Sequence, residues 1–358
     1  MYLNSLTLLN FKNYEHFEGS FSRKLNCFVG QNGIGKTNLL DAIHYLAFSK
    51  SYFNTVDSQN IRHSEPFFMI QGVFEKNNEP VELQCSVKRN QKKVFKRNQL
   101  EYEKLSDHIG FIPVVMISPA DNELIYESSE IRRKFIDAII SQYDRYYLDQ
   151  LVQYTHVLKQ RNALLRNFFE QNYYDKETLD IWTEQLINYG IKIVETRKSF
   201  LKEFQPLFNK NYEFISLSKE DVSLNYLNSV KGDFKHELEN CLAKDRMLNY
   251  TSVGPHKDDL EFVINGFPLK KFASQGQQKS FLLALKLAQY EFIKVKKSVS
   301  PLLLLDDIYD KLDELRFNRL IELVGGNEFG QVFITDTHPE RIHHLMKNKS
   351  VENKVFEF

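Results

Sequence analysis

Residues Gly30–Thr37 read GQNGIGKT, the spacing of a phosphate-binding loop. This spacing is G-x-x-x-x-G-K-T, in which a glycine-rich loop points successive backbone N–H groups at phosphate oxygens. Lys36 is predicted to reach the β- and γ-phosphates of a nucleotide, and the Thr37 hydroxyl to hold Mg²⁺. The predicted contacts of this phosphate loop are Gly30, Gln31, Asn32, Gly33, Ile34, Gly35, Lys36, Thr37 and Asn38.

The sequence on both sides of the loop supports this interpretation. Leu25–Val29 (LNCFV) is a short apolar, strand-like run, and Asn38–Phe48 (NLLDAIHYLAF) has the apolar spacing of a helix. A phosphate loop requires this context, because the positive N-terminal end of the helix attracts the phosphates. The alternative is a chance glycine-rich turn, which has no need of a strand before it and a helix after it.

The composition is that of a globular protein, with 42% apolar and 26% charged residues among 358. Lys+Arg and Asp+Glu both number 47, so positive charge for binding a nucleic acid must be local. The N-terminal residues show neither a signal peptide nor a spanning helix. Three widely spaced cysteines favour reduced thiols in the cytoplasm over a disulfide framework or a zinc site.

Residues 67–97 carry strand patterns and a cluster of basic side chains. Phe67–Glu75 and Val81–Lys88 are predicted to be neighbouring antiparallel strands, and Val94–Arg97 to continue their sheet. The basic side chains either solvate a hairpin or contact a DNA backbone. They are Lys88, Arg89, Lys92, Lys93, Lys96 and Arg97.

The middle of the chain is predicted to be helical. From Glu130, apolar positions recur every three to four residues for about seventy-five residues. Apolar stripes at 148–165 and 182–200 predict two long helices that form a hairpin, although Gly190 interrupts the second stripe. This region is far too short for the extended coiled coil of a chromosome-organising ATPase.

Strand patterns return after these helices. Residues 212–216 and 260–264 are strand-like, and Asn265-Gly266 predicts a hairpin turn. A long apolar helix is predicted over 274–294, and the apolar strand Pro301–Asp307 (PLLLLDD) follows. A further helix is predicted through 315–324.

An apolar strand that ends in carboxylates completes the metal site of an NTPase. Asp306 is predicted to bind Mg²⁺ opposite Thr37, directly or through water, and Asp307 to polarise the attacking water. The alternative is a buried strand with solvated acids at its end. Without a phosphate loop, that alternative would be the better interpretation.

The spacing of these motifs favours a nucleotide-binding head that is split by an inserted helical domain. Lys36 and Asp306 are about 270 residues apart, a distance that is rare in a small kinase or GTPase. Split heads carry a short Ser/Gly/Gln signature at the start of a helix, and Ser274–Lys279 (SQGQQK) matches it. In that class the signature caps the γ-phosphate of ATP bound by a second subunit. An ordinary helix N-cap is the alternative.

Together these features resemble the RecF family of recombination mediators, which is related to the ATPase heads of SMC and ABC proteins. The resemblance covers nearly the whole chain and includes motifs outside the nucleotide site. The motifs are FKNY (11–14), GQNGIGKTNLLDAI (30–43), ISPADNELI (117–125), RRKFID (132–137), LKQRNALL (158–165), VGPHKDDL (253–260), SQGQQKS (274–280), LLLLDDIYDKLD (302–313) and TDTH (335–338).

The resemblance implies an α/β fold: an ABC/SMC-type ATPase head, with the phosphate loop in a mixed β lobe, and an inserted, mainly α-helical second domain. The head is expected to comprise 1–117 and 250–358, and the inserted domain 118–249. Two heads are expected to enclose two ATP molecules with Mg²⁺. Each ATP would contact Lys36 and Thr37 of one subunit and Ser274, Gly276 and Gln277 of the other.

The resemblance also implies roles at other positions. Asp307 matches the catalytic carboxylate, with a shorter side chain than the Glu usual in relatives. Lys12 of FKNY is expected near the adenine, and His338 at a switch position near the γ-phosphate. Asp310–Asp313 (DKLD) matches a loop that crosses the dimer interface, and residues 117–123 are where a glutamine switch loop is expected.

The implied function is an ATP-driven switch in recombinational repair and replication restart. The ATP-bound dimer is expected to bind duplex DNA near single-stranded gaps and, with RecR and RecO, to help load RecA. Slow, DNA-stimulated ATP hydrolysis would reset it, in the cytoplasm and in association with the nucleoid. Two alternatives remain open: the ATPase subunit of a membrane transporter, whose signature usually reads Leu-Ser-Gly-Gly-Gln, and a metabolic phosphotransferase, which has no use for SQGQQKS.

Overall fold

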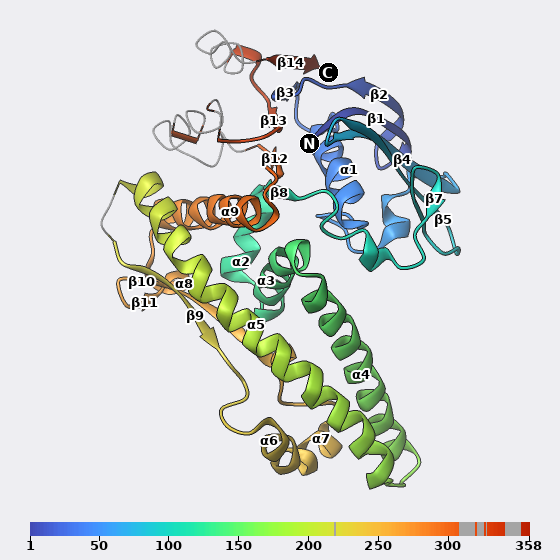
Figure 1. Cartoon of the computed structure of the whole chain (residues 1–358), viewed down its shortest axis with the longest axis vertical. Coiled ribbons are helices and arrows are strands. Elements are labelled where there is room, and N and C mark those ends of the chain that lie inside the picture. The colour runs from blue at the N-terminus through green and yellow to red at the C-terminus, as the bar shows by residue number, and fades with distance from the viewer. Residues whose placement is uncertain (218–219, 308–318, 321–325, 327, 341–351) are drawn as a thin grey trace. The chain divides into compact units, whose positions relative to one another are not determined.

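A computed structural model describes residues 1–217, 220–307, 319–320, 326, 328–340 and 352–358 (Figure 1). The chain divides into two compact units. Unit 1 comprises Met1–Asn122, Lys210–Ser218 and Ser274–Phe358, and unit 2 comprises Glu123–Asn209 and Lys219–Ala273. Among the described residues, none of the helices is long and apolar enough to cross a membrane.

Unit 1 contains a parallel sheet that carries the phosphate loop. Its strands are β3 (Leu25–Val29), β8 (Val114–Ile117), β12 (Leu302–Leu305), β13 (Val332–Asp336) and β14 (Asn353–Glu357). Their order is β14-β3-β13-β12-β8. Every residue of β8, β12 and β13 is buried, as expected for a parallel sheet covered on both faces. The carboxyl ends of β3, β13 and β12 therefore meet at one edge.

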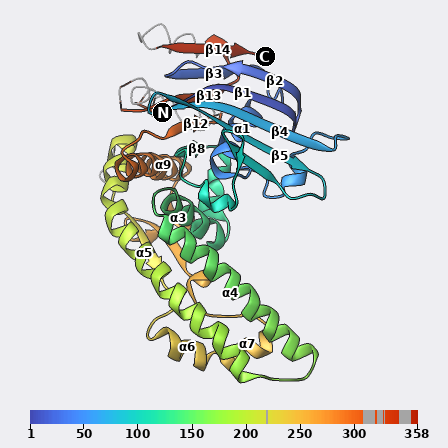
Figure 2. The ribbon, with the colours of Figure 1, turned by 45° about the vertical axis from the view of Figure 1, so that its right-hand side comes forward.

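A second sheet of unit 1 is antiparallel. Its strands are β1 (Tyr2–Phe11), β2 (Tyr14–Ser20), β4 (Phe67–Lys76), β5 (Glu79–Lys88), β6 (Val94–Arg97) and β7 (Leu100–Glu101), in the order β2-β1-β4-β5-β6-β7. Figure 2 shows β1, β4 and β5 side by side. The pairing of β4 with β5 and of β5 with β6 confirms the predicted antiparallel strands.

Helix α1 (Lys36–Phe48) is covered by both sheets. It packs against β1, β4 and β5 of the antiparallel sheet and against β8 and β13 of the parallel sheet. A Cβ atom at Gly72 of β4 would lie 2.6 Å from Leu46 Cδ1, so a residue without a side chain lets the helix approach the strand. All residues of α1 except Thr37 and Asn38 are buried.

The long helix α9 (Gln275–Lys297) also belongs to unit 1 and confirms the helix predicted there. It packs against β8, and an unbroken run of its residues from Ser280 to Tyr290 is buried. A helix that is buried all round lies inside the core of a domain. Its N-terminus carries the SQGQQK signature, and its C-terminus leads into β12.

Unit 2 contains the predicted helical hairpin, formed by α4 (Arg145–Glu170) and α5 (Lys176–Ser216), although the last residues of α5 belong to unit 1. Arg161 Nε of α4 donates a hydrogen bond to Thr183 Oγ1 of α5 at 3.1 Å. Gly190 does not interrupt α5; a Cβ there would lie 2.6 Å from the Phe234 ring, so close packing explains the glycine. The other helices of unit 2 are α2 (Glu123–Tyr126), α3 (Ser129–Tyr143), α6 (Phe234–Asn240), α7 (Leu242–Leu248) and α8 (Leu269–Phe272).

The predicted hairpin turn at Asn265-Gly266 joins β10 (Asp259–Ile264) to β11 (Phe267–Pro268). Asn265 has φ 50° and Gly266 has φ 80°, the left-handed values that a two-residue hairpin turn requires. Strand β9 (Val222–Leu227) pairs with the other edge of β10. This sheet lies in unit 2, whose last segment ends at Ala273. The expected division into a head (1–117 and 250–358) and an inserted domain (118–249) stays a prediction.

The strand predicted at 212–216 is wrong, because these residues form the end of α5. Phe204, Phe208, Tyr212 and Ile215 are buried at helical spacing and continue the apolar face of that helix. The predicted helix through 315–324 lies outside the described residues except at 319–320. The same holds for the whole of the expected interface loop, Asp310–Asp313.

Candidate functional site

The phosphate-loop motif joins β3 to α1, as predicted. Lys36 is only 4% exposed, and its Nζ donates hydrogen bonds to the carbonyl oxygens of Gly30 (2.7 Å) and Gln31 (2.9 Å). Residues 31–34 are exposed, as backbone groups that bind a ligand must be. The loop therefore offers its backbone to solvent while its lysine lies underneath it.

Thr37 and Asp306, which are far apart in sequence, meet at the edge of the parallel sheet. Thr37 Oγ1 donates a hydrogen bond of 2.7 Å to Asp306 Oδ1. The Thr335 hydroxyl of β13 lies 3.0 Å from the same oxygen, and it accepts a 2.9 Å hydrogen bond from the Asp307 backbone N–H. The β3-β13-β12 order explains this meeting, because it sets the ends of these strands side by side.

The oxygen atoms of this cluster fit a magnesium ion. Mg²⁺ prefers hydroxyl, carboxylate, phosphate and water oxygens and takes only one or two ligands from the protein in nucleotide sites. Thr37 and Asp306 would hold it, beside Asp307. The described residues include no cluster of three His, Cys, Asp or Glu side chains suited to a metal, so an ion here would need nucleotide or water ligands as well.

Asp306 is held in a state that favours a bound cation. Burial raises the pKa of its carboxyl to about 6; the hydrogen bond from Thr37 lowers this pKa in part, and the negative charge of Asp307 raises it further. Above pH 6 the buried carboxyl is ionised at a cost to the fold. A cation beside it would offset that cost.

We expect Asp306→Asn to stabilise the nucleotide-free protein above pH 6. A carboxyl with a raised pKa binds its proton more tightly in the folded state, so wild-type stability falls as pH rises from about 4 to about 6. The gain in the variant is on the order of 1–3 kcal/mol at pH 8. Urea unfolding at pH 4 and pH 8 measures it, with exposed Glu103→Gln as the control. A gain of equal size at both pH values would contradict this origin.

Asn13 of FKNY holds the phosphate loop through two hydrogen bonds, a clamp that was not predicted from the sequence. Asn13 Nδ2 donates a 2.9 Å hydrogen bond to the Ile34 carbonyl, and Asn13 Oδ1 accepts one of 2.7 Å from Asn38 Nδ2. Gly35 has φ 118°, and a Cβ there would lie 2.4 Å from Asn13 Nδ2 and 2.9 Å from the Tyr14 hydroxyl. The FKNY motif was the only sequence signal for this contact, and the spacing of its residues does not indicate that Asn13 binds the loop.

We expect Asn13→Ala to weaken nucleotide binding about tenfold without unfolding the protein, because each hydrogen bond that holds the loop contributes about 1 kcal/mol. Titration with a fluorescent ATP analogue measures the affinity, and thermal unfolding checks the fold. Gln91→Ala, at an exposed amide side chain of the same unit, is the control. Unchanged affinity in Asn13→Ala would show that the loop keeps its shape without the clamp.

Lys12 is engaged in a different way from the expected contact with adenine. Its Nζ forms a 2.6 Å ion pair with Asp41, whose side chain is fully buried on α1. The same Nζ lies 5.4 Å from the centre of the Phe53 ring. Lys12 therefore ties FKNY to α1, and its contact with the base stays a prediction.

Ser274 forms the N-cap of α9. Its Oγ accepts a 3.2 Å hydrogen bond from Gln277 N, and Gln277 Oε1 accepts one of 2.6 Å from Ser274 N, which makes a capping box. The N-cap alternative is thus present in the structure. Ser274 is exposed, and its described hydrogen bonds lie within this first turn, so its contact with a nucleotide of a second subunit stays a prediction.

His338 follows the end of β13 and is exposed. Its backbone N–H donates to Asp336 Oδ1 (2.7 Å), and its Nδ1 lies 2.8 Å from Thr337 Oγ1. Among the described contacts, none joins His338 to Lys36, Thr37 or Asp306. Its switch role stays a prediction.

Several side chains of the basic cluster at 88–97 make contacts within unit 1. Lys93 pairs with Asp57 at 2.8 Å, and the Arg97 guanidinium lies over the rings of Tyr102 and Phe111. Arg97 is nevertheless exposed, as are Lys88, Arg89 and Lys92. Arg89 Nε also donates a 3.1 Å hydrogen bond to the Glu65 carbonyl. Contact of this cluster with a DNA backbone stays a prediction.

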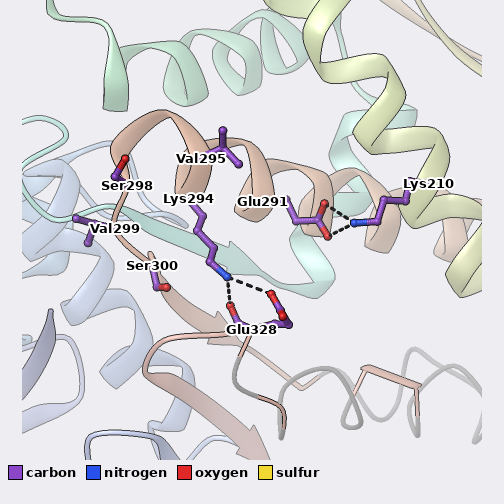
Figure 3. Close-up of a pocket in the computed structure, with 8 residues that line it drawn as sticks. All are labelled: Lys210, Glu291, Lys294, Val295, Ser298, Val299, Ser300 and Glu328. Atoms are coloured by element: carbon purple, nitrogen blue, oxygen red, sulfur yellow. Dashed lines mark hydrogen bonds and ion pairs between the residues drawn. The ribbon is translucent and has the colours of Figure 1, made fainter.

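A hollow of about 470 Å³ lies at the C-terminal end of α9 (Figure 3). Lys210 pairs with Glu291, and Lys294 with Glu328, each at 3.2 Å. Its other lining residues are Val295, Ser298, Val299 and Ser300. Because its four charges already pair with one another, the hollow offers no net charge to a phosphate and is not the predicted site.

Comparison with known proteins identifies the family. The family model described as RecF/RecN/SMC N terminal domain matches residues 2–355. A protein of Flavobacterium johnsoniae named DNA replication and repair protein RecF is 54% identical over 357 residues, 99% of each chain. The chain belongs to the RecF family.

Solved structures agree with membership of the RecF family. One of the recombination mediator protein RecF-ATP in the RecFOR pathway has a TM-score of 0.90 at 30% identity, over 99% of this chain and 95% of that chain. An Smc head bound to the C-winged helix domain of ScpA, with a TM-score of 0.56 at 16% identity, covers 100% of this chain and 94% of that one. This second likeness shows the fold alone. The fold is the α/β fold of ABC/SMC-type ATPase heads, as predicted.

Proposed function

We propose that this protein is an ATP-binding and ATP-hydrolysing protein of DNA replication and recombinational repair. The observation that carries the proposal is the meeting of Lys36, Thr37, Asp306 and Asp307 at one sheet edge, although the two motifs are distant in sequence. A relative with 54% identity is named for DNA replication and repair, and a solved relative contains ATP.

The residues of the site have separate tasks in this proposal. Lys36 pairs with the β- and γ-phosphates, while the exposed backbone of residues 31–34 surrounds them. Thr37 and Asp306 hold Mg²⁺, which would neutralise charge that develops on the phosphates. Asp307 orients and polarises the attacking water. Because Asp307 is shorter than a glutamate, we infer that hydrolysis is slow.

Assembly completes the site. Ser274, Gly276 and Gln277 lie at the start of α9, where the helix end attracts anions. We propose that they contact the γ-phosphate held by a second copy of the chain. ATP then raises the population of the dimer, because it binds the dimer better than the monomer. His338 would sense the same phosphate, and Lys12 would lie near the base.

The dimer is proposed to bind duplex DNA near single-stranded gaps and, with RecR and RecO, to help load RecA. Dimerisation doubles the surface that can contact DNA, so the dimer binds DNA with a higher affinity than one subunit alone. The transporter alternative is not favoured, because the chain belongs to the RecF family.

Retention of DNA on a filter tests the function. We expect duplex and gapped DNA to be retained on the filter with ATP and to pass through it without ATP. Retention should be stronger at low salt, because contacts with DNA phosphates release counterions. Sedimentation of the same samples reports the dimer. Absence of retention with every nucleotide, at every salt concentration, would overturn the proposal.

A further inference from the structure

Helix α9 carries a lysine in the middle of its buried region. The Lys286 side chain is 5% exposed, and its neighbours Leu285 and Leu287 are buried as well. Burying an ammonium group is costly unless it is paired and hydrogen-bonded. An apolar residue of similar volume would avoid that cost, so the ammonium needs an explanation.

The described contacts of this ammonium include three oxygen atoms of unit 1. Lys286 Nζ lies 2.6 Å from Asp121 Oδ1 and donates hydrogen bonds to the Tyr52 hydroxyl and the Met116 carbonyl, each at 3.0 Å. Three oxygens match the three N–H donors of a lysine. Asp121 is itself 5% exposed, so the ion pair is buried from both sides.

The far side of the pair is fixed to backbone and to a second helix. Asp121 Oδ2 accepts a 2.8 Å hydrogen bond from Ser118 N, directly after β8, and Asp121 Oδ1 also accepts from the Tyr52 hydroxyl. The Tyr52 backbone N–H donates to Asp41 Oδ1 on α1 at 2.6 Å. Asp41 follows Thr37 by four residues and is on the same face of α1.

These contacts form a continuous polar connection between α9 and α1, whose buried residues are mostly apolar. Apolar contacts are not directional, so they tolerate small rotations and shifts of a helix. A slip of one residue rotates a helix by about 100° and moves it about 1.5 Å. A buried ion pair with a fixed geometry does not tolerate such a slip, and buried polar groups are best attested in setting register.

We propose that Lys286 and Asp121, together with Tyr52, are positioning residues that fix α9 relative to α1. Ser274 at the N-cap lies twelve residues before Lys286 on the same helix, about 18 Å along its axis. The pair therefore presents the signature at a set place relative to the phosphate loop of the same subunit. This inference rests on the proposed function, in which that signature completes the nucleotide site of a second copy.

The test separates positioning from folding by removing the pair in two ways. Lys286→Met alone leaves a buried, unpaired carboxylate and lowers the thermal unfolding temperature. Lys286→Met combined with Asp121→Asn leaves no unpaired charge and keeps an acceptor for the Ser118 N–H. Its thermal unfolding temperature should therefore lie close to that of the wild type. We expect the double variant to bind a fluorescent ATP analogue within about twofold of the wild type but to form the ATP-dependent dimer about tenfold more weakly.

Two further variants complete the experiment. Tyr52→Phe removes one hydroxyl and is expected to weaken the dimer about threefold, again with unchanged ATP affinity. Lys294→Met, on the same helix but paired at the surface with Glu328, is the matched control and leaves both quantities unchanged. A folded double variant or Tyr52→Phe variant that dimerises like the wild type would overturn the positioning role. A wild-type chain without an ATP-dependent dimer overturns the proposed function and this inference with it, and the wild-type sample alone reveals that case.

Discussion

We expect Lys36→Ala to lose ATP binding and, with it, ATP-dependent dimerisation. Lys36 lies inside the loop, 2.7 Å from the Gly30 carbonyl and 2.9 Å from that of Gln31, so it is the cation nearest to the phosphates that the loop would hold. Each charge-assisted hydrogen bond contributes about 1.5–3 kcal/mol, so the loss of two or three weakens binding by at least about a hundredfold. Equilibrium titration and sedimentation with ATP measure the two effects.

The control for this variant is Lys50→Ala, at an exposed lysine just beyond the end of α1. It keeps the loop intact and should leave ATP affinity unchanged. Thermal unfolding of both variants verifies that the head is folded. Wild-type ATP affinity in Lys36→Ala would refute the role of this side chain.

Asp307→Asn is expected to retain ATP binding while it slows hydrolysis by about a hundredfold, the low end of what a general base contributes. The variant preserves the local backbone, because Asp307 has φ 43°, a region that asparagine adopts readily. Its N–H can still donate to Thr335 Oγ1. Only the negative oxygen that polarises water is lost, so the ATP-bound dimer should persist longer.

Single-turnover phosphate release measures the chemical step, and light scattering after dilution measures the lifetime of the dimer. Asp306→Asn provides the contrast, since it should weaken Mg²⁺-dependent nucleotide binding as well as turnover. A normal rate of phosphate release in Asp307→Asn would show that the attacking water is activated elsewhere.

Local sequence patterns predicted the parts of the site that depend on spacing. The loop, its flanking strand and helix, and the carboxylates after β12 each carry a pattern within a short window. The partners of Asn13, Thr335 and Lys286 could not be predicted in this way, because these contacts join distant segments. The residues next to Lys286 in the sequence are apolar, and only the fold brings Asp121 beside it.

The wrong prediction at 212–216 has a related cause. Aromatic and β-branched residues such as Tyr212, Phe214 and Ile215 favour strands locally, but this preference is weak compared with tertiary packing. The apolar stripe of α5 decided the outcome. Likewise, the pairing of β9 with β10 joins segments that no local pattern brings together.

The double covering of α1 has a consequence for amide hydrogen exchange. Beyond its first turn the helix is buried between two sheets, so its amides should exchange with deuterium only through large opening of unit 1. The amides of residues 31–34 are in an exposed loop and should exchange quickly until a phosphate is bound. Isotope uptake at the loop would then report nucleotide occupancy, while uptake in the adjoining helix would report the opening of the fold.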